Sequence, residues 1–211
     1  MRMRKVKWAV DYLTESTHIV TSPDSLKGRW KEYLNCNELH VEIGCGKGNY
    51  SLNMAIKYPE QGYVAIEKNE SAAGMAAKKF DENESEAHLA LIRGDASEIV
   101  NWFEEGEVDV IHLNFSDPWP KKRYAKRRLS SKSFLNQYRM ILSEKGQIQM
   151  KTDNSSLFEY SVLEFQNNGF TMIDFSVDYR REAHDEDVMT EYEEKFVEKE
   201  QPIYRCVWKK I

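Results

Sequence analysis

The amino-acid sequence predicts a single α/β domain with a mostly parallel, seven-stranded β-sheet and helices on both faces. Short apolar runs of the kind that form buried strands alternate with amphipathic stretches of helical spacing. A glycine or an acidic residue follows several of these runs, as expected where strands lead into ligand-binding loops. The length of 211 residues suits one domain with a substantial core.

The expected elements follow one another without an internal repeat or a linker. Branched and aromatic apolar runs predict strands at 39–43, 63–66, 89–92, 108–114, 148–150, 170–177 and 203–208. Apolar residues spaced three and four apart predict helices at 49–58, 71–80, 99–103, 131–142 and 157–165. Helices between successive strands indicate parallel βαβ units. The last two strands lack a clear helix between them, so we expect an antiparallel C-terminal pair joined by a mostly solvated acidic loop at 182–200.

The first part of the chain has little regular periodicity. We expect residues 1–38 to form a basic arm and lead-in, and residues 39–211 to form the single domain. The arm has four cations and no acid in its first seven residues: Arg2, Arg4, Lys5 and Lys7. Such a segment can lie over the domain and help to hold RNA, or its first residues can be disordered.

Cysteine, histidine and hydropathy patterns exclude several classes of protein. The three cysteines have no CxxC spacing and the five histidines have no metal-like spacing, so we expect neither a disulfide framework nor a metal site. No apolar run approaches the ~20 residues of a membrane span, and no signal-peptide core follows the basic start. We expect a reduced, cytoplasmic protein without a membrane partner. The sequence leaves a monomer and a homodimer both open.

The stretch 114–129, NFSDPWPKKRYAKRRL, combines an acid, an aromatic residue and a dense cationic run. Asp117 follows an expected strand end, and the prolines on either side of Trp119 predict a rigid turn. Six cations then lie within eight residues: Lys121, Lys122, Arg123, Lys126, Arg127 and Arg128. The net charge of the whole chain is −5, which on its own argues against binding to nucleic acid, but a concentrated basic patch on an acidic body is expected to attract phosphates locally. The grouping suits RNA; the alternatives are a solvated charged face or a localisation signal.

A glycine-rich loop, EIGCGKG at 42–48, lies between the first expected strand and the first helix of the domain. Its glycines, Gly44, Gly46 and Gly48, let the backbone approach a ligand, and the helix N-terminus favours an anionic group. Glu67 follows the second strand, where a carboxylate can accept both hydroxyls of a ribose. The spacing GxGxG differs from the GxGxxG of dinucleotide-binding proteins. The loop resembles the first motif of class I S-adenosylmethionine-dependent methyltransferases, and an ordinary tight turn is the structural alternative.

Resemblance to that class implies further cofactor contacts. An acid near the glycine loop attends the ammonium group of the cofactor, and Glu42 occupies that position here. Asp95 and Ala96 follow the third strand, where the class contacts adenine. Because the carboxyl ends of parallel strands meet at one edge of the sheet, we expect these residues to share one S-adenosylmethionine pocket.

The run at 114–129 resembles the signature of the tRNA (guanine-N7-)-methyltransferase family. The similarity continues in KTDN at 151–154, TEYEEKF at 190–196 and QPIY at 201–204, and covers nearly the whole chain in the expected order. The resemblance implies a Rossmann-like class I fold. It also implies transfer of a methyl group from S-adenosylmethionine to N7 of a guanosine at position 46, in the tRNA variable loop.

The same resemblance implies a role for each matching residue. The cofactor pocket would be lined by Glu42, Gly44, Gly46, Gly48, Glu67, Asp95, Ala96 and Asp117. The substrate would be contacted by Lys121, Asp153, Thr190, Glu191, Tyr192 and Glu193, with Asp117 and Asp153 as the catalytic pair. The tRNA would be bound by Lys122, Arg123, Lys126, Arg127 and Arg128.

Two other functions fit part of the pattern. Amino-group methyltransferases of nucleic-acid bases carry [DNS]PP[YFW] after the fourth strand, which Asp117-Pro118-Trp119 matches only partly. A non-enzymatic RNA-binding module of the same fold is the other alternative, although such a module has no need of a complete cofactor loop. Trp119 is expected either to stack on the target base or to pack under its own turn. Taken alone, the spacing of Tyr192 and Phe196 favours packing over substrate contact.

Overall fold

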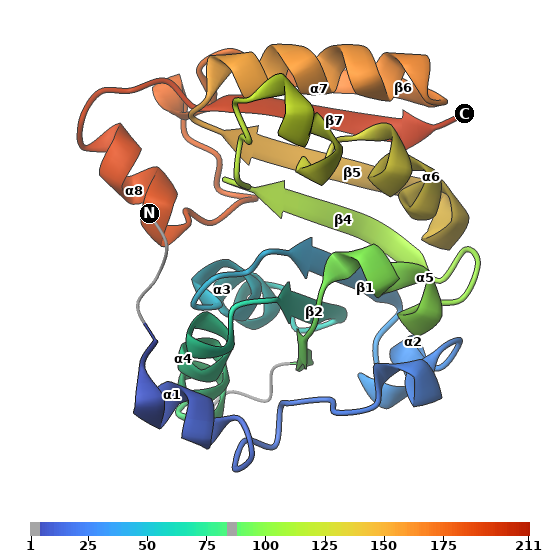
Figure 1. Ribbon diagram of the computed structural model, residues 1–211, viewed down its shortest axis with the longest axis vertical. Helices are drawn as coiled ribbons and strands as arrows, with labels where there is room; N and C mark the ends of the chain where they lie inside the picture. Colours follow the sequence, from blue (N-terminus) through green and yellow to red (C-terminus); the bar gives the residue numbers. More distant parts are fainter. Residues whose placement is uncertain (1–4, 84–87) are drawn as a thin grey trace.

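A seven-stranded sheet runs through the computed structural model, which describes residues 5–83 and 88–211 (Figure 1). The strands are β1 (Glu38–Ile43), β2 (Gln61–Glu67), β3 (Leu89–Arg93), β4 (Val108–Asn114), β5 (Leu142–Thr152), β6 (Phe170–Ser176) and β7 (Tyr204–Lys210). Their spatial order is β3-β2-β1-β4-β5-β7-β6. The first five strands are parallel, and β7 runs antiparallel to both β5 and β6. The predicted fold class, with its antiparallel C-terminal pair, is confirmed.

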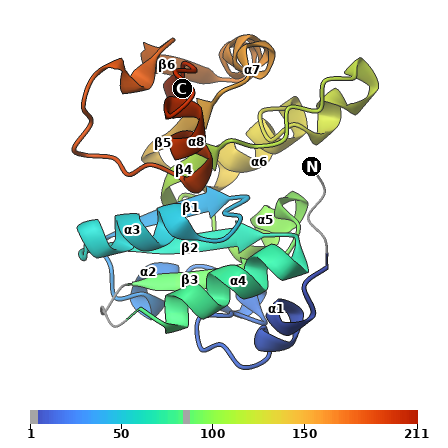
Figure 2. The same cartoon turned by 90° about the vertical axis from the view of Figure 1, so that its left-hand side faces the viewer.

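Helices cover both faces of the sheet (Figure 2). They are α1 (Lys7–Tyr12), α2 (Trp30–Tyr33), α3 (Asn49–Lys57), α4 (Glu70–Asp81), α5 (Ile99–Trp102), α6 (Lys132–Ile141), α7 (Ser155–Asn167) and α8 (Glu191–Val197), with 3-10 segments η1 (Pro23–Leu26), η2 (Ala96–Glu98), η3 (Lys122–Arg127) and η4 (Tyr179–Arg181). The helices α3 and α4 pack with Tyr63 and Leu91 in one apolar cluster. The helices α5, α6 and α7 pack on the other face with Val41 and Ile66. Alternating strand side chains thus form a core on each side of the sheet.

Two regions of the C-terminal half differ from the sequence prediction. The strand β5 spans eleven residues, whereas the apolar pattern predicts only 148–150. The stretch 182–200 is not a mostly solvated loop, because it contains α8 and the nearly inaccessible carboxylates of Asp187 and Glu193. Thr190 and Glu193 form a reciprocal capping box at the start of α8. This helix therefore depends on capping and on tertiary ion pairs, which apolar periodicity does not detect.

The described part of the lead-in packs against the domain. The helix α1 lies so close to α4 that a Cβ atom on Gly74 would fall 1.6 Å from the carbonyl oxygen of Ala9. Trp30 is fully buried in the core, and its Nε1 donates a hydrogen bond to the Trp102 carbonyl oxygen at 2.7 Å. Arg2 and Arg4, which the sequence assigns to the basic arm, lie outside the described residues. The lead-in is thus joined to the domain from Val6 onward.

Candidate active site

The carboxyl ends of the parallel strands meet at one edge of the sheet, and the candidate site lies there (Figure 1). The neighbour of β1 on one side is β2, and its neighbour on the other side is β4, so the strand order reverses at this point. Ligands of open α/β sheets bind beside such a reversal. The loop between β1 and α3 therefore occupies the expected ligand-binding position.

Three glycines shape this loop, and each has a positive φ angle: 81° at Gly44, 59° at Gly46 and 77° at Gly48. Residues with a side chain rarely adopt this region, so glycine is needed at these positions. A Cβ atom on Gly44 or Gly46 would meet no heavy atom within 4 Å, so both glycines border open space. A Cβ atom on Gly48 would fall 2.5 Å from Cε1 of Phe80. Gly48 therefore serves the packing of the loop on α4.

A pocket of about 130 Å³ opens beside the first two glycines. Its walls are the glycine loop, the end of β4 at Asn114 and Phe115, and the first turn of α8. From α8, the residues Thr190, Glu191 and Tyr192 line the pocket. Segments far apart in the sequence thus form one cavity, and three of the four expected substrate contacts of α8 lie on it.

Glu42 lines the pocket from β1, with only 2% of its surface exposed. The hydroxyl of Ser51 donates a hydrogen bond to its Oε2 at 2.5 Å, and Nδ2 of Asn114 donates one to its Oε1 at 3.0 Å. Burial raises the pKa of this carboxyl, and the two hydrogen bonds oppose the shift. The pair of donors fixes a carboxyl group beside the glycine loop, where an ammonium group can bind to it.

Glu67 lies at the end of β2, next to the glycine loop but outside the residues that line the pocket. Its carboxylate accepts hydrogen bonds from the Gly46 N–H at 2.9 Å and from the Asn69 N–H at 2.7 Å. Burial raises the pKa of Glu67, and the negative charge of Asp117 adds to the rise. Glu67 thus connects the glycine loop to the loop that follows β2.

Asp95 and Ala96 follow β3, one strand further from the pocket. The Asp95 carboxylate accepts a hydrogen bond from the Ser97 N–H at 3.0 Å, which caps η2. It also pairs with Lys68, and this hydrogen-bonded ion pair lowers the pKa of Asp95. Ala96 is buried at the start of η2. Both residues lie on the same edge of the sheet as the pocket without lining it.

Asp117 and Asp153 are exposed on the loops after β4 and β5. Between Asp117 and the basic run, Trp119 has a φ angle of 42° and is half-buried. Its ring contacts Tyr124 edge-on at a centroid distance of 6.0 Å, and the Arg127 guanidinium lies 4.9 Å from its centroid. These contacts favour packing within its own turn over stacking on a base.

The basic run forms η3, and most of its cations are solvated. The exposed members are Lys121, Lys122, Arg123, Lys126 and Arg127. Arg128 is half-buried: its Nε donates to the Pro118 carbonyl oxygen at 2.9 Å and its Nη2 to that of Trp119 at 3.1 Å. Its guanidinium also lies 4.2 Å from the centroid of the Tyr160 ring. Arg128 therefore braces the turn, and its surroundings do not support the expected RNA contact.

The first turn of α8 presents its side chains in different directions. Tyr192 is 60% exposed at the pocket, so its position does not support the packing that its spacing with Phe196 favours. Glu191 pairs with Lys47 of the glycine loop and with Lys79 of α4, at 3.3 Å each. Glu193 is fully buried and does not line the pocket. The substrate contact expected of Glu193 therefore has no support in its position.

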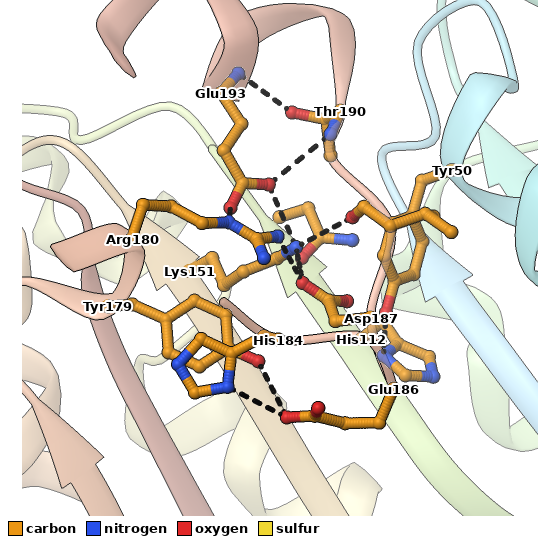
Figure 3. Close-up of polar contacts among 12 residues, drawn as sticks. Tyr50, His112, Lys151, Tyr179, Arg180, His184, Glu186, Asp187, Thr190 and Glu193 are labelled. Atoms are coloured by element: carbon orange, nitrogen blue, oxygen red, sulfur yellow. Dashed lines mark hydrogen bonds and ion pairs between the residues drawn. The ribbon is translucent and has the colours of Figure 1, made fainter. Parts of the chain in front are cut away.

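Three further charged residues lie around Glu193, and no sequence pattern predicts their role: Lys151, Arg180 and Asp187 (Figure 3). Lys151 begins the KTDN stretch, but a lysine at a strand end gives no sign of being buried. Arg180 and Asp187 lie in strongly charged sequence without periodicity. Only the tertiary fold brings these side chains together.

Comparison with known proteins agrees with this arrangement. A family model described as "Putative methyltransferase" matches residues 36–206. The tRNA (guanine-N(7)-)-methyltransferase of Oceanobacillus iheyensis is 47% identical over 208 residues, covering 98% of this chain and 97% of that protein. That of Bacillus licheniformis is 45% identical over 207 residues, covering 97% of each. This chain belongs to the tRNA (guanine-N(7)-)-methyltransferase family.

Solved structures of other methyltransferases share the fold of this chain. An antibiotic-related methyltransferase superposes with a TM-score of 0.66 at 16% identity, covering 91% of this chain and 96% of that chain. The 16S rRNA methyltransferase KamB gives a TM-score of 0.65 at 11% identity, covering 85% and 91%. At such identities the likeness shows the Rossmann-like class I fold alone.

The described part of this family member shows neither a metal-binding cluster nor a membrane-spanning helix. Within residues 5–83 and 88–211, no group of three or more His, Cys, Asp or Glu side chains is arranged to hold a metal ion. Within the same residues, no helix combines the length and apolarity that crossing a membrane requires.

The buried rings of His40 and His112 contact each other, Nδ1 to Nε2, at 2.9 Å. Burial lowers the pKa of His112 well below its usual value, which fits a structural role.

Proposed function

We propose that this protein transfers the methyl group of S-adenosylmethionine to N7 of a guanosine at position 46, in the variable loop of tRNA. The observation that carries the proposal is the meeting of three surfaces at one sheet edge. These are the glycine-loop pocket, the exposed acids Asp117 and Asp153, and the cationic segment η3. A cofactor, a base and an RNA backbone each find matching chemistry there.

The residues at this edge fit S-adenosylmethionine. The open space beside Gly44 and Gly46 admits its amino-acid end, and the Glu42 carboxyl is placed to pair with its ammonium group. We assign its ribose hydroxyls to Glu67 and its adenine to the Asp95-Ala96 segment, at the ends of β2 and β3. When bound, the cofactor supplies an electrophilic methyl group on a sulfonium.

The protein has little acid–base work to do in this reaction. Guanine N7 carries an in-plane lone pair and loses no proton on methylation, so no general base is required. The chain must hold N7 in line with the methyl group, which lowers the entropic part of the barrier. The purine becomes cationic as the bond forms. The carboxylates of Asp117 and Asp153 are assigned to stabilise that charge, or to accept hydrogen bonds from guanine N1–H and N2–H₂.

The target base has to leave its stack before it can react. In A-form RNA, N7 faces a deep and narrow groove, so the nucleotide is expected to be splayed out. Tyr192 offers an exposed ring on the pocket wall, next to Thr190 and Glu191, on which a purine can stack. Lys121 and the exposed cations of η3 are assigned to the phosphates. The proposed partner is thus tRNA in the cytoplasm, and both a monomer and a homodimer are compatible with this site.

The proposal is tested by incubating the protein with unmodified tRNA and S-adenosylmethionine, followed by borohydride reduction and aniline cleavage. A single cut at position 46 is the expected result, because this chemistry cleaves at 7-methylguanosine. Methyl incorporation without a cut would favour an exocyclic-amino methyltransferase. tRNA binding without incorporation would favour a non-enzymatic RNA-binding module. Asp117→Asn serves as the site control and is expected to reduce cutting strongly while S-adenosylmethionine still binds in calorimetry.

A further inference from the structure

Four alternating charges form a closed ring beneath α8, which we call the charge ring: Lys151, Asp187, Arg180 and Glu193 (Figure 3). The side chains of the two cations are 4% and 8% exposed, and those of the two acids 10% and 0%. Burial to this degree is unusual for charged residues, which are rarely fully buried unless they are paired. None of the four residues is assigned above to the cofactor or to RNA phosphates. Only Glu193 is expected from the sequence to contact the substrate.

Each member of the charge ring contacts both members of opposite charge. Nζ of Lys151 lies 2.7 Å from Oδ2 of Asp187 and 2.8 Å from Oε2 of Glu193. The Arg180 guanidinium closes the ring, with Nη2 2.5 Å from Asp187 Oδ2 and Nε 2.6 Å from Glu193 Oε1. Two positive and two negative charges therefore balance inside the protein.

The charge ring joins the end of β5 and the segment η4 to the start of α8, which lines the pocket. Lys151 lies at the end of β5, two residues before the exposed Asp153. Arg180 belongs to η4, and Glu193 to the first turn of α8. Oε2 of Glu193 also accepts the Thr190 N–H at 3.2 Å, and the Thr190 hydroxyl accepts the Glu193 N–H at 3.0 Å. The position of the α8 pocket wall is thus set by the end of β5.

Stability alone is a weak reason for such an arrangement. The attraction within a buried ion pair offsets little more than the free energy that is lost when its charges leave water. Replacing such a pair by apolar residues of similar size often leaves the protein at least as stable. A closed ring of charge-assisted hydrogen bonds nevertheless fixes distances and directions, since each carboxylate is held by two cationic donors. Lys151 Nζ also donates to the Val188 carbonyl oxygen at 3.2 Å and lies 4.8 Å from the centroid of the Tyr50 ring.

We propose that Lys151, Arg180, Asp187 and Glu193 are positioning residues for methyl transfer, and that they act by holding the first turn of α8 against the end of β5. This inference rests on the proposed function. Thr190 and Tyr192 then face the pocket at a fixed distance from Asp153. Glu193 acts through the ring and does not touch the guanine. A shift of about 1 Å at a reacting centre is enough to reduce turnover about 100-fold, so loss of the ring is expected to lower kcat by that order.

The first test compares Lys151→Met, the double variant Lys151→Met/Asp187→Asn and the control Lys145→Met. Lys145 is an exposed lysine near the start of the same strand. The single variant leaves two carboxylates facing one cation, whereas the double variant keeps one pair, Arg180 with Glu193. We expect a loss of about 100-fold in kcat for the single variant, with a smaller change in KM for tRNA, and substantial recovery in the double variant. A folded single variant with wild-type kcat, or a folded double variant no better than the single one, overturns the proposal.

A second measurement needs no activity and therefore separates this inference from the proposed function. Amide hydrogen exchange of residues 191–197 is expected to accelerate in Lys151→Met, while exchange in α4 stays unchanged. If the wild-type protein shows no cut at position 46 but α8 still loosens, the proposed function fails and the structural part of the inference stands. Unchanged exchange in α8 contradicts the inference whatever the activity.

A third measurement decides between positioning and direct contact by Glu193. Glu193→Gln keeps the shape of the side chain and removes its charge, so it also serves if Lys151→Met does not fold. Inosine at the target position keeps N7 but lacks the 2-amino group of guanine. If Glu193 only positions α8, the variant loses kcat and keeps the wild-type preference for guanosine over inosine. A lost preference would instead show that its carboxylate reads the base.

Discussion

At the scale of single residues, the acids of the site differ in how far they are removed from water. Glu42 is enclosed by Ser51 and Asn114, and burial raises its pKa. Asp117 and Asp153 follow neighbouring strands but remain exposed. The buried acid is therefore suited to a fixed pairing with a cofactor cation, and the exposed acids to a base that arrives from solvent. Residue type and strand position alone do not distinguish these environments.

The buried state of Glu42 predicts a particular dependence of stability on pH. Its pKa is higher in the folded protein than in the unfolded chain, so the folded state binds the proton more tightly. The resulting stabilisation is present below the unfolded pKa of about 4.3 and is lost as pH rises through the folded pKa. The Glu42→Gln variant has no carboxyl group to titrate at this position, so its stability does not decrease in this way. We expect the free energy of unfolding of the variant to rise relative to wild type as pH increases above about 4.3.

Urea unfolding at a series of pH values measures this difference, with the exposed residue Glu144 changed to Gln as the control. If the curves of Glu42→Gln and wild type stay parallel across this range, the buried carboxyl does not titrate as argued. The same variant is expected to bind S-adenosylmethionine more weakly, because a neutral amide replaces the proposed partner of its ammonium group.

At the scale of elements, the lead-in helix α1 packs closely against α4. Gly74 allows the Ala9 carbonyl to approach α4, and the hydroxyl of Ser71 accepts a hydrogen bond from the Val6 N–H at 2.9 Å. A glycine in a helix interior costs up to about 1 kcal/mol relative to alanine. Its presence here is explained by the space that α1 occupies.

Gly74→Ala is therefore expected to displace α1 although alanine favours the helix α4. The added methyl group would collide with a backbone carbonyl, and overpacking of this kind typically costs about 1–3 kcal/mol. We expect a lower melting temperature and faster tryptic cleavage after Lys5 and Lys7. Ser71→Ala removes only the hydrogen bond and is expected to have a smaller effect. A Gly74→Ala protein as resistant as wild type would show that α1 shifts without strain.

Most elements of the domain could be predicted from the sequence, because their apolar spacing reflects burial against the sheet. The prediction failed where long-range contacts decide the structure. The helix α8 begins at a capping box and depends on cations from β5 and η4. Trp30 lies in an aperiodic segment but is packed in the core, where its Nε1–H is satisfied by the distant Trp102 carbonyl. In the site, the glycines and the strand-end acids could be predicted from local motifs. The burial of Glu193 could not, because its ion-pair partners are distant in sequence. The burial of Arg128 depends on the folded turn that it contacts.

At the scale of the whole molecule, charge is distributed unevenly. The chain carries a net charge of −5, yet η3 and its flanks present five exposed cations beside the sheet edge that holds the pocket. A concentrated basic surface on an acidic body attracts RNA to that surface. The binding of tRNA should therefore weaken with salt through a small number of phosphate contacts.

Replacing Lys122, Arg123 and Arg127 by alanine is expected to make tRNA binding less sensitive to salt. Each lost phosphate contact lowers the slope of log K against log salt by about 0.7–0.9, so the slope should fall by roughly 2–3. The matched control replaces Lys57, Lys145 and Lys209, exposed cations near the opposite ends of the parallel strands. Titrations at several salt concentrations measure both slopes. Equal slopes in the two triple variants would place the phosphate contacts elsewhere.

The strand order has a consequence for how the chain reaches its final structure. The last strand in sequence, β7, lies between β5 and β6 and supplies the sheet partner of both. Until residues 204–210 are in place, β6 has no strand partner, and its backbone N–H and C=O groups stay open to mispairing. The parallel strands can assemble earlier during synthesis, since domains fold from the N-terminal side. We therefore expect the pairing of β7 with β5 and β6 to be a late step of folding. A chain without residues 204–210 is expected to aggregate through β6 while its glycine loop is still folded.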